Sequence, residues 1–141
     1  MEKNMEKAYD HLQTESDWYS RWEENRLFTP ATDASGIPFS IILPPPNVTG
    51  SLHIGHALTL SLPDIIVRRK KMQGFNVLWL PGVDHAGIAT QMVVEKTLKK
   101  EKGLSKEDLG REQFLQLVWD WKNASQQKIV SQIKKLGLAL D

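Results

Sequence analysis

Apolar residues along the 141-residue chain form two short runs and several longer stretches with helical spacing. The runs at residues 39–43 and 76–80 resemble strands that are covered on both faces in a parallel sheet. Between them, residues 53–73 show the helical period, and Gly74 provides a C-terminal stop. This order predicts one βαβ unit and an α/β fold with a Rossmann-like order of elements. The apolar set expected on the central helix is Ile54, Ala57, Leu58, Leu62, Ile65, Ile66 and Met72.

A proline interrupts this central helix. Pro63 removes one backbone hydrogen bond and clashes with the preceding turn, at a cost of about 3 kcal/mol inside a helix. We therefore expect a kink, or a new helix start with Pro63 in its first turn and Ser61 near its cap.

Three further helices are predicted around this unit. The first runs to about Arg26 with Thr14 or Ser16 as its cap, and its aromatic stripe is expected to pack on the main domain. A short helix over residues 87–100 precedes a turn capped by Ser105, and residues 111–136 form the longest periodic stretch, with Gly137 as its stop. The stripe comprises Trp18, Tyr19 and Trp22; the long helix presents Phe114, Leu117, Val118, Trp121, Ala124, Ile129, Ile133 and Leu136.

Composition narrows the class of protein. The net charge of +1 implies no overall attraction to nucleic acid, and the absence of cysteine excludes disulfides and thiolate metal sites. The first seven residues have no apolar segment typical of a secretory signal, and no apolar run approaches the ~20 residues that span a bilayer. We expect a cytoplasmic protein that does not contact a membrane.

The loop between the first run and the central helix carries the candidate chemistry. Residues 44–56 read Pro-Pro-Pro-Asn-Val-Thr-Gly-Ser-Leu-His-Ile-Gly-His. A helix start offers unpaired backbone N–H groups and a positive dipole end, which suit a nucleotide phosphate. Gly50 and Gly55 allow a close approach to the backbone, and His53 and His56 are spaced so that both rings can point the same way.

Three ordered blocks resemble the class I aminoacyl-tRNA synthetases, and among them the valine–tRNA ligases. The first is the loop just described, whose signature segment comprises Pro46, Asn47, Val48, Thr49, Gly50, Ser51, Leu52, His53, Ile54, Gly55 and His56. The second is Leu-Pro-Gly-Val-Asp-His-Ala-Gly-Ile-Ala-Thr-Gln at residues 80–91. The third is Leu-Gly-Arg-Glu at residues 109–112, followed by Val-Trp-Asp-Trp-Lys at residues 118–122.

The resemblance implies the first half of a Rossmann-like catalytic fold with parallel strands and a preceding N-terminal helix. It divides the chain into a helical lead-in at residues 1–34 and the first part of the catalytic domain at residues 35–141, which ends near the expected insertion of the editing domain. The family's second signature, Lys-Met-Ser-Lys-Ser, does not occur in the sequence. We therefore expect full activity only in the complete enzyme.

The implied reaction is the attack of the valine carboxylate on the α-phosphorus of ATP, followed by transfer of the valyl group to tRNA(Val). His53 and His56 are the catalytic candidates as donors to phosphate oxygens, although one histidine could only cap the helix. ATP, with its Mg²⁺, is a substrate rather than a permanently bound cofactor, and no resident metal site is expected. The implied ATP-binding residues are Thr49, Gly50, His53, Gly55, His56 and His85.

Amino-acid binding is assigned to residues of the first and second blocks. Asp84 follows a strand end, where ligands gather in α/β sheets, and the family's aspartate holds the substrate ammonium group. The alternative role for Asp84 is to cap the next helix. Pro44, Pro45 and Asn47 would line the pocket, although a proline-shaped loop explains them nearly as well. Thr90 and Gln91 are weaker candidates for its polar wall.

Two other features are interpreted as structural. The basic run at residues 68–71 resembles a tRNA contact, but it is more simply explained as a solvent-facing complement to the end of its own helix. Trp119 and Trp121 cannot share one helix face. We expect Trp121 in the core and Trp119 at an interface with the remaining catalytic, editing and anticodon-binding parts of the enzyme.

Two other hypotheses stay open at this point. The chain could be a truncated, non-catalytic module or paralogue that binds a nucleotide, or a small nucleotidyltransferase that uses His-X-Gly-His. The second block argues against the nucleotidyltransferase.

Overall fold

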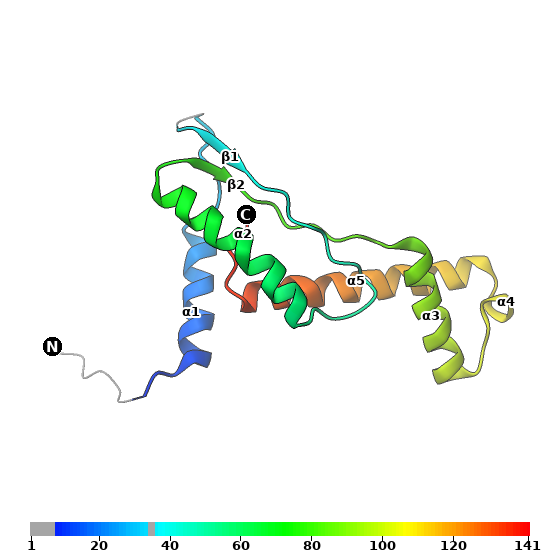
Figure 1. Ribbon diagram of the computed structural model, residues 1–141. Helices are drawn as coiled ribbons and strands as arrows, with labels where there is room; N and C mark the ends of the chain where they lie inside the picture. Colours follow the sequence, from blue (N-terminus) through cyan, green and yellow to red (C-terminus); the bar gives the residue numbers. More distant parts are fainter. Residues whose placement is uncertain (1–7, 34–35) are drawn as a thin grey trace.

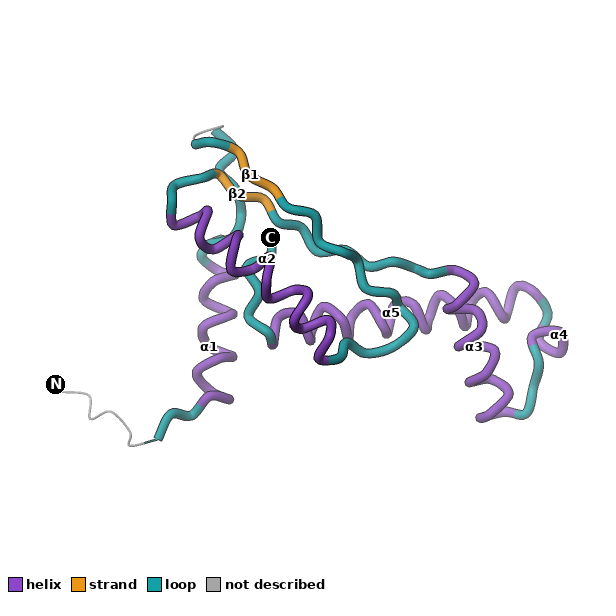
Figure 2. The backbone as a smooth tube through the Cα atoms, in the orientation of Figure 1, coloured by secondary structure: helices purple, strands orange, loops and turns teal. Residues whose placement is uncertain are grey.

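The computed structural model describes residues 8–33 and 36–141, and the predicted boundary between residues 34 and 35 lies outside these ranges (Figure 1). The longest helix, α5, forms an axis along which the other elements are arranged; α1 and α2 lie near its C-terminal half, and α3 and α4 near its start (Figures 1 and 2). The elements are α1 (His11–Glu24), β1 (Pro38–Ser40), α2 (Ile54–Met72), β2 (Asn76–Leu78), α3 (Gly87–Lys102), α4 (Lys106–Leu109) and α5 (Arg111–Lys135).

The two strands pair in parallel, which confirms the predicted βαβ unit. Phe39 faces Val77 in this register, and α2 crosses between the strands. Both strands are shorter than the predicted runs. The prediction that both of their faces are covered is wrong. Ile42 is 87% exposed and Leu80 is 56% exposed, because no described part of the chain covers that side.

Helix α2 begins at the predicted site and runs without a break through Pro63. The predicted new helix start at Pro63 is therefore wrong. Ser61, expected near a cap, lies inside the helix and donates its hydroxyl to the Ala57 carbonyl at 2.8 Å. The helix is therefore continuous despite the N–H group that proline lacks.

The apolar set expected on α2 is not the set of residues that this chain buries. Leu60 and Val67 are the buried residues of this helix. Within the predicted apolar set, Ala57 is partly buried and the larger side chains are exposed. The exposed members are Ile54, Leu58, Leu62, Ile65, Ile66 and Met72. The pattern identified an apolar helix correctly but could not tell which side this chain itself would cover.

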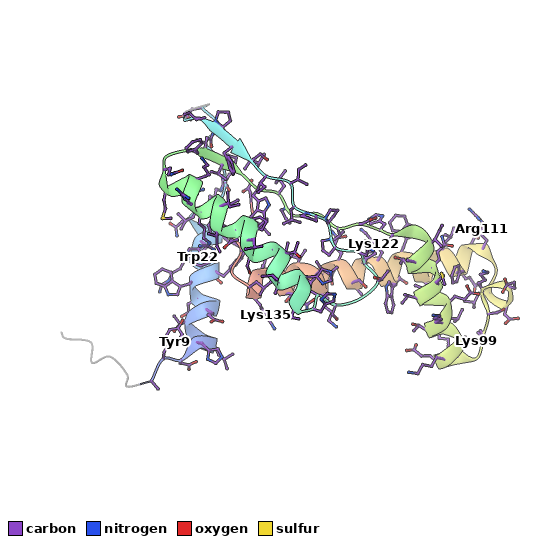
Figure 3. All side chains as sticks on the ribbon, in the orientation of Figure 1. Tyr9, Trp22, Lys99, Arg111, Lys122 and Lys135 are labelled. Atoms are coloured by element: carbon purple, nitrogen blue, oxygen red, sulfur yellow. The ribbon has the colours of Figure 1, made fainter. Side chains whose placement is uncertain are left out.

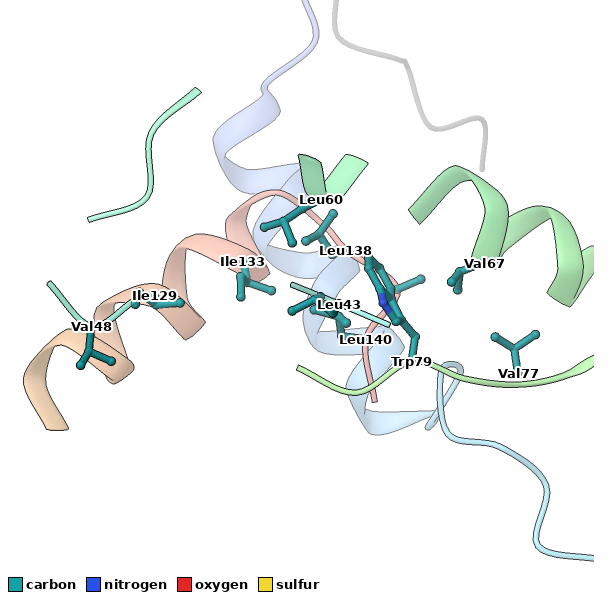
Figure 4. Packing of buried hydrophobic residues seen from close by; sticks show 11 residues of the cluster. Leu43, Val48, Leu60, Val67, Val77, Trp79, Ile129, Ile133, Leu138 and Leu140 are labelled. Atoms are coloured by element: carbon teal, nitrogen blue, oxygen red, sulfur yellow. The ribbon is translucent and has the colours of Figure 1, made fainter. Parts of the chain in front are cut away.

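The main core lies where α2, β2, the C-terminal half of α5 and the last residues of the chain meet (Figure 4). Trp79, Ile129 and Leu138 are almost completely buried there. The end of the chain is tied to this core, since the Asp141 N–H donates to the Trp79 carbonyl at 3.1 Å. Trp79 also carries the one buried side-chain N–H that lacks a hydrogen-bond partner among the described residues.

A second, smaller core joins α3 to the start of α5. Val94, Leu98 and Phe114 form it, and Trp121 packs against its edge. Helix α3 ends at Gly103 with a left-handed cap, and α4 begins with the predicted Ser105 cap. The predicted stop of α5 is also confirmed, because Gly137 adopts a φ of 69° directly after the helix.

Helix α1 begins earlier than predicted, at His11 rather than near Thr14 or Ser16. The reason is Asp10, whose carboxylate accepts a hydrogen bond from the Leu12 N–H at 3.1 Å. Tyr19 packs as expected and donates its hydroxyl to the Leu138 carbonyl at 3.3 Å. Trp18 is 49% exposed, so the predicted aromatic stripe is only partly buried.

The basic run at residues 68–71 is built into the fold, and its predicted orientation toward solvent holds only for Arg69. Arg68 binds the Asp64 carboxylate at 2.8 Å and the Gly137 carbonyl, and its guanidinium lies over the Trp22 ring, labelled in Figure 3. Lys70 lies 4.2 Å from the Phe75 ring centre. Burial lowers the pKa of Lys71, while the nearby Asp141 carboxylate opposes that change. These contacts weaken the hypothesis of a tRNA contact.

Candidate functional site

The first block forms the loop between β1 and α2, and this loop runs beside α5 (Figures 1 and 2). It surrounds a hollow of about 440 Å³ at the N-terminus of α2. The residues that line the hollow are Pro44, Pro45, Pro46, Asn47, Thr49, Gly50, Ser51, Leu52, His53, His56, Thr59 and Leu60. Eight of the eleven predicted signature residues are therefore brought together around one concave surface, and Val48, Ile54 and Gly55 do not line it.

The two histidines cap the helix reciprocally. His53 is the N-cap of α2, and its Nδ1 accepts a hydrogen bond from the Gly55 N–H at 3.1 Å. The Nδ1 of His56 accepts from the His53 N–H at 3.3 Å, and the ring centres lie 4.0 Å apart. Because Nδ1 is an acceptor in both rings, the nitrogen left to donate is Nε2 in each case. The capping role and the donor role, treated as alternatives in the sequence, are therefore compatible.

Gly55 makes this arrangement possible. A Cβ atom at this position would lie 3.0 Å from Cε1 of His53 and 3.1 Å from its Nδ1, which is closer than side chains normally approach. Gly50 has open space around it, so a ligand could approach the loop backbone there. The two glycines thus differ in role: one accommodates the His53 ring, and the other leaves the loop accessible.

The second block joins the first through its backbone. Asn47 and Asp84 form an isolated parallel bridge, in which the Val48 N–H donates to the Asp84 carbonyl at 3.0 Å. The Asp84 N–H donates to the Pro46 carbonyl at 2.9 Å. The exposed carboxylate of Asp84 therefore lies next to the signature loop, although it does not line the hollow itself.

Asp84 does not act as the N-cap of α3. That position belongs to Ala86, which has a φ of 45° and receives no side-chain cap. Oδ1 of Asp84 instead accepts a hydrogen bond from the Ala86 N–H at 2.8 Å, which fixes the turn between the bridge and α3. The turn holds the carboxylate in one place beside Asn47.

The other second-block candidates have different surroundings. The His85 ring meets Trp119 edge-on, with ring centres 6.0 Å apart, so it faces α5. Thr90 is only 2% exposed and donates its hydroxyl to the His85 carbonyl at 2.6 Å. The prediction that Thr90 forms part of a pocket wall is therefore wrong, because its polar group is buried and already bonded. Gln91 is exposed on α3.

Two residues that contact the signature loop were not predicted to do so. Trp121 donates its indole N–H to the Val48 carbonyl at 2.9 Å, and Gln132 bonds to both backbone groups of Leu52. The sequence pattern identified Trp121 only as a core residue of the third block. Gln132 carries no signal of its own, since a polar residue on a helix is usually exposed.

A second, larger groove of about 1550 Å³ lies between α1, α2 and the C-terminal half of α5. It shares no residue with the hollow at the signature loop, and we do not assign the chemistry to it. Within residues 8–33 and 36–141, no group of three or more histidine, aspartate or glutamate side chains is placed to hold a metal ion. No helix in those same ranges is both long and apolar enough to cross a membrane.

These features define a class of protein. The family model described as tRNA synthetases class I (I, L, M and V) matches residues 17–141, and the chain belongs to this family. A solved structure of the agnB2 LeuRS from Agrobacterium radiobacter K84, in a ternary complex with tRNA and LeuAMS, matches 94% of the chain with a TM-score of 0.74. At 22% identity this likeness confirms the fold.

The similar curated proteins are valine–tRNA ligases. The enzyme of Gloeobacter violaceus is 53% identical over 141 residues, which are 100% of this chain and 16% of the relative. The enzyme of Nitratidesulfovibrio vulgaris is 54% identical over 140 residues, or 99% of this chain and 16% of that protein. The mitochondrial valine–tRNA ligase 1 of Arabidopsis thaliana is 50% identical over the full chain, which spans 13% of its length. The resemblance read from the three blocks is confirmed.

Proposed function

We propose that this chain is the first part of the catalytic domain of a valine–tRNA ligase, and that the hollow at the start of α2 binds ATP during valine activation. The observation that carries the proposal is the pair of histidines that cap α2. Their Nε2 atoms are left as donors at the positive end of the helix. The valine–tRNA ligases that match the whole chain support the same substrates.

In this proposal the valine carboxylate is the nucleophile, so the protein needs no nucleophilic side chain of its own. The carboxylate attacks the α-phosphorus, the bond to the pyrophosphate oxygen breaks, and negative charge builds on the phosphoryl oxygens. His53 and His56 donate from Nε2 to those oxygens. Removing one preorganised donor typically costs about 2.7–4 kcal/mol of transition-state stabilisation. The bound ATP carries its Mg²⁺ as part of the substrate.

Substrate placement is assigned to the bridge between the two blocks. Asp84 binds the valine ammonium group, and Pro44, Pro45 and Asn47 form a small, rigid wall for a short side chain. Thr49 and Gly50 allow ATP to lie close to the loop backbone, and Gly55 contributes to the ATP site by leaving room for the His53 ring, while His85 approaches the adenosine. The exposure of Asp84 and its fixed position beside Asn47 support this division of roles.

The complete ligase contributes the remaining catalytic, editing and anticodon-binding parts and acts on tRNA(Val) in the cytoplasm. We expect the isolated chain to bind a valyl-adenylate analogue without catalysing exchange at the rate of a complete enzyme. The exposed apolar face of α2 supports this view, because the chain leaves uncovered a surface that the rest of a ligase would cover.

The test is ATP–pyrophosphate exchange by a complete ligase that carries this segment, with valine, isoleucine and leucine compared at equal concentrations. The proposal predicts that valine supports the fastest exchange. Exchange that does not depend on valine, or that isoleucine or leucine drives faster, would contradict it. A parallel measurement on the isolated chain should give exchange at least tenfold slower than the complete enzyme. Comparable rates would contradict the proposal that this chain supplies only part of the catalytic site.

A further inference from the structure

Helix α5 holds the signature loop at two points. The indole N–H of Trp121 donates to the Val48 carbonyl at 2.9 Å. Eleven residues further along the helix, the Gln132 side chain accepts from the Leu52 N–H at 3.0 Å and donates to the Leu52 carbonyl at 3.4 Å. An amide side chain thus pairs with one residue of the loop much as a neighbouring strand would.

The two contacts lie on one face of α5. Eleven residues correspond to about three helical turns, so Trp121 and Gln132 point in nearly the same direction. Between them on that face is Ile129, which is completely buried beside the equally buried Val48 side chain. Leu52 packs against the same core. The loop side chains are therefore held by apolar contacts, while its backbone is fixed by Trp121 and Gln132.

The second contact lies next to the catalytic candidates. Leu52 directly precedes His53, whose own N–H donates to Nδ1 of His56. A shift of the Leu52 backbone would therefore change where both imidazoles present their Nε2 atoms. Neither Trp121 nor Gln132 lines the hollow, so neither is expected to touch substrate.

We propose that Gln132 and Trp121 are positioning residues, which hold the loop so that His53 and His56 meet the phosphoryl group in the right place. This inference rests on the proposed function. Displacing reacting groups by about 1 Å can cost on the order of 100-fold in rate. Loss of the Gln132 contact should therefore lower kcat about 10- to 100-fold and leave the KM for valine within threefold.

The matched pair of variants is Gln132→Met and Gln127→Met in a complete ligase that carries this segment. Both replace glutamine by a side chain of similar length on α5, but Gln127 is exposed on the side that lines the larger groove. Hydrogen–deuterium exchange of the peptide covering residues 48–56 should be faster in Gln132→Met alone, because the Leu52 N–H loses its acceptor. Equal exchange in the two variants and the parent would overturn the proposed contact.

The kinetic arm is a double-mutant cycle with His56→Ala. A residue that acts through the histidine loses its effect when the histidine is absent, whereas a general loss of stability costs the same in both backgrounds. Gln132→Met should lower kcat at least tenfold in the parent and at least threefold less beside His56→Ala, where His53 is the donor left for it to position. Equal costs in both backgrounds, or an unchanged kcat in the parent, would overturn the inference.

Trp121→Phe gives a second reading that keeps most of the ring packing and removes the N–H donor. It should lower kcat about 3- to 30-fold, while Trp18→Phe on α1 leaves kcat unchanged, since Trp18 lines the larger groove and not the hollow at the signature loop. If the parent is active, an equal cost of Gln132→Met in both backgrounds together with an unchanged kcat for Trp121→Phe would overturn the positioning role and leave the proposed function in place. A parent without valine-dependent exchange would instead overturn the proposed function.

Discussion

The inner and outer sides of α2 contrast sharply. On the inner side Leu60 and Val67 are buried against β2, α5 and the end of the chain. On the outer side Leu58 is 64% exposed and Ile54 is 86% exposed. A single helix therefore presents one apolar face to a finished core and another to solvent.

The difference shows which interactions this chain satisfies by itself. The backbone of the signature loop is held on the inner side, by Trp121, Gln132 and the bridge to Asp84. The outer side has no such partner among the described residues, in a chain that spans 16% of a curated relative. An apolar surface of this kind usually lies at an interface, and under the proposed function it is the side that faces the rest of the ligase.

The largest expected effect comes from a pair of leucines on opposite sides of α2. Leu60→Ala removes a side chain that is 3% exposed and should lower the free energy of unfolding by about 2–5 kcal/mol. Leu58→Ala changes the same chemistry two residues away and should cost less than about 0.5 kcal/mol in the isolated chain. Urea denaturation of both variants measures the difference, and equal losses would mean that the two sides are not distinct.

A second effect concerns the Asp84 carboxylate, which is held beside the signature loop but is exposed. Asparagine at position 84 can still accept the Ala86 N–H, so Asp84→Asn should preserve the turn. A charged hydrogen bond to the substrate ammonium is worth roughly 1.5–3 kcal/mol, so valine affinity should fall by about one to two decades. ATP affinity should stay within threefold. Separate titrations of valine and ATP into the complete ligase decide this, and an unchanged valine affinity would limit Asp84 to the turn.

The smallest effect lies in α4, which precedes the start of α5 and lies away from both sides of α2. Hydrogen bonds from the Ser105 backbone and hydroxyl lower the pKa of the Asp108 carboxyl group. A lowered folded-state pKa means that this stabilisation is present above the ordinary pKa of aspartate and is lost as the pH falls through the lowered value. Ser105→Ala removes the hydroxyl bond to the carboxylate, and with it the hydroxyl cap on the Asp108 N–H, but keeps the backbone bond from Ser105, so the pKa should rise only part of the way. An NMR titration of Asp108 measures it, and an identical curve would contradict the assignment.

The sequence was informative where local chemistry decides the structure. The βαβ order, the Ser105 cap and the stop at Gly137 follow from periodicity and from residues with strong backbone preferences. The grouping of most signature residues around one hollow also followed, because they are neighbours in a single loop. Roles that depend on adjacent positions are therefore the ones that a sequence reveals.

Contacts between distant segments could not be predicted in this way. Gln132 lies eighty positions after Leu52, and nothing in its neighbourhood distinguishes it from an exposed glutamine. Thr90 could not be known to donate to the His85 carbonyl rather than to a ligand. The sequence also could not show that most of the apolar set of α2 is exposed, because periodicity reports that a helix has an apolar face, and not whether the same chain covers it.

The most direct test of the account is the rate of valine-dependent pyrophosphate exchange by His56→Ala in the complete ligase. Nε2 of His56 is the atom proposed to donate to the charge that develops at phosphorus, because its Nδ1 accepts the His53 N–H. Loss of that donor should lower kcat by about 10²–10³-fold while the KM for valine changes little. A folded variant that retains the parental exchange rate would contradict the account.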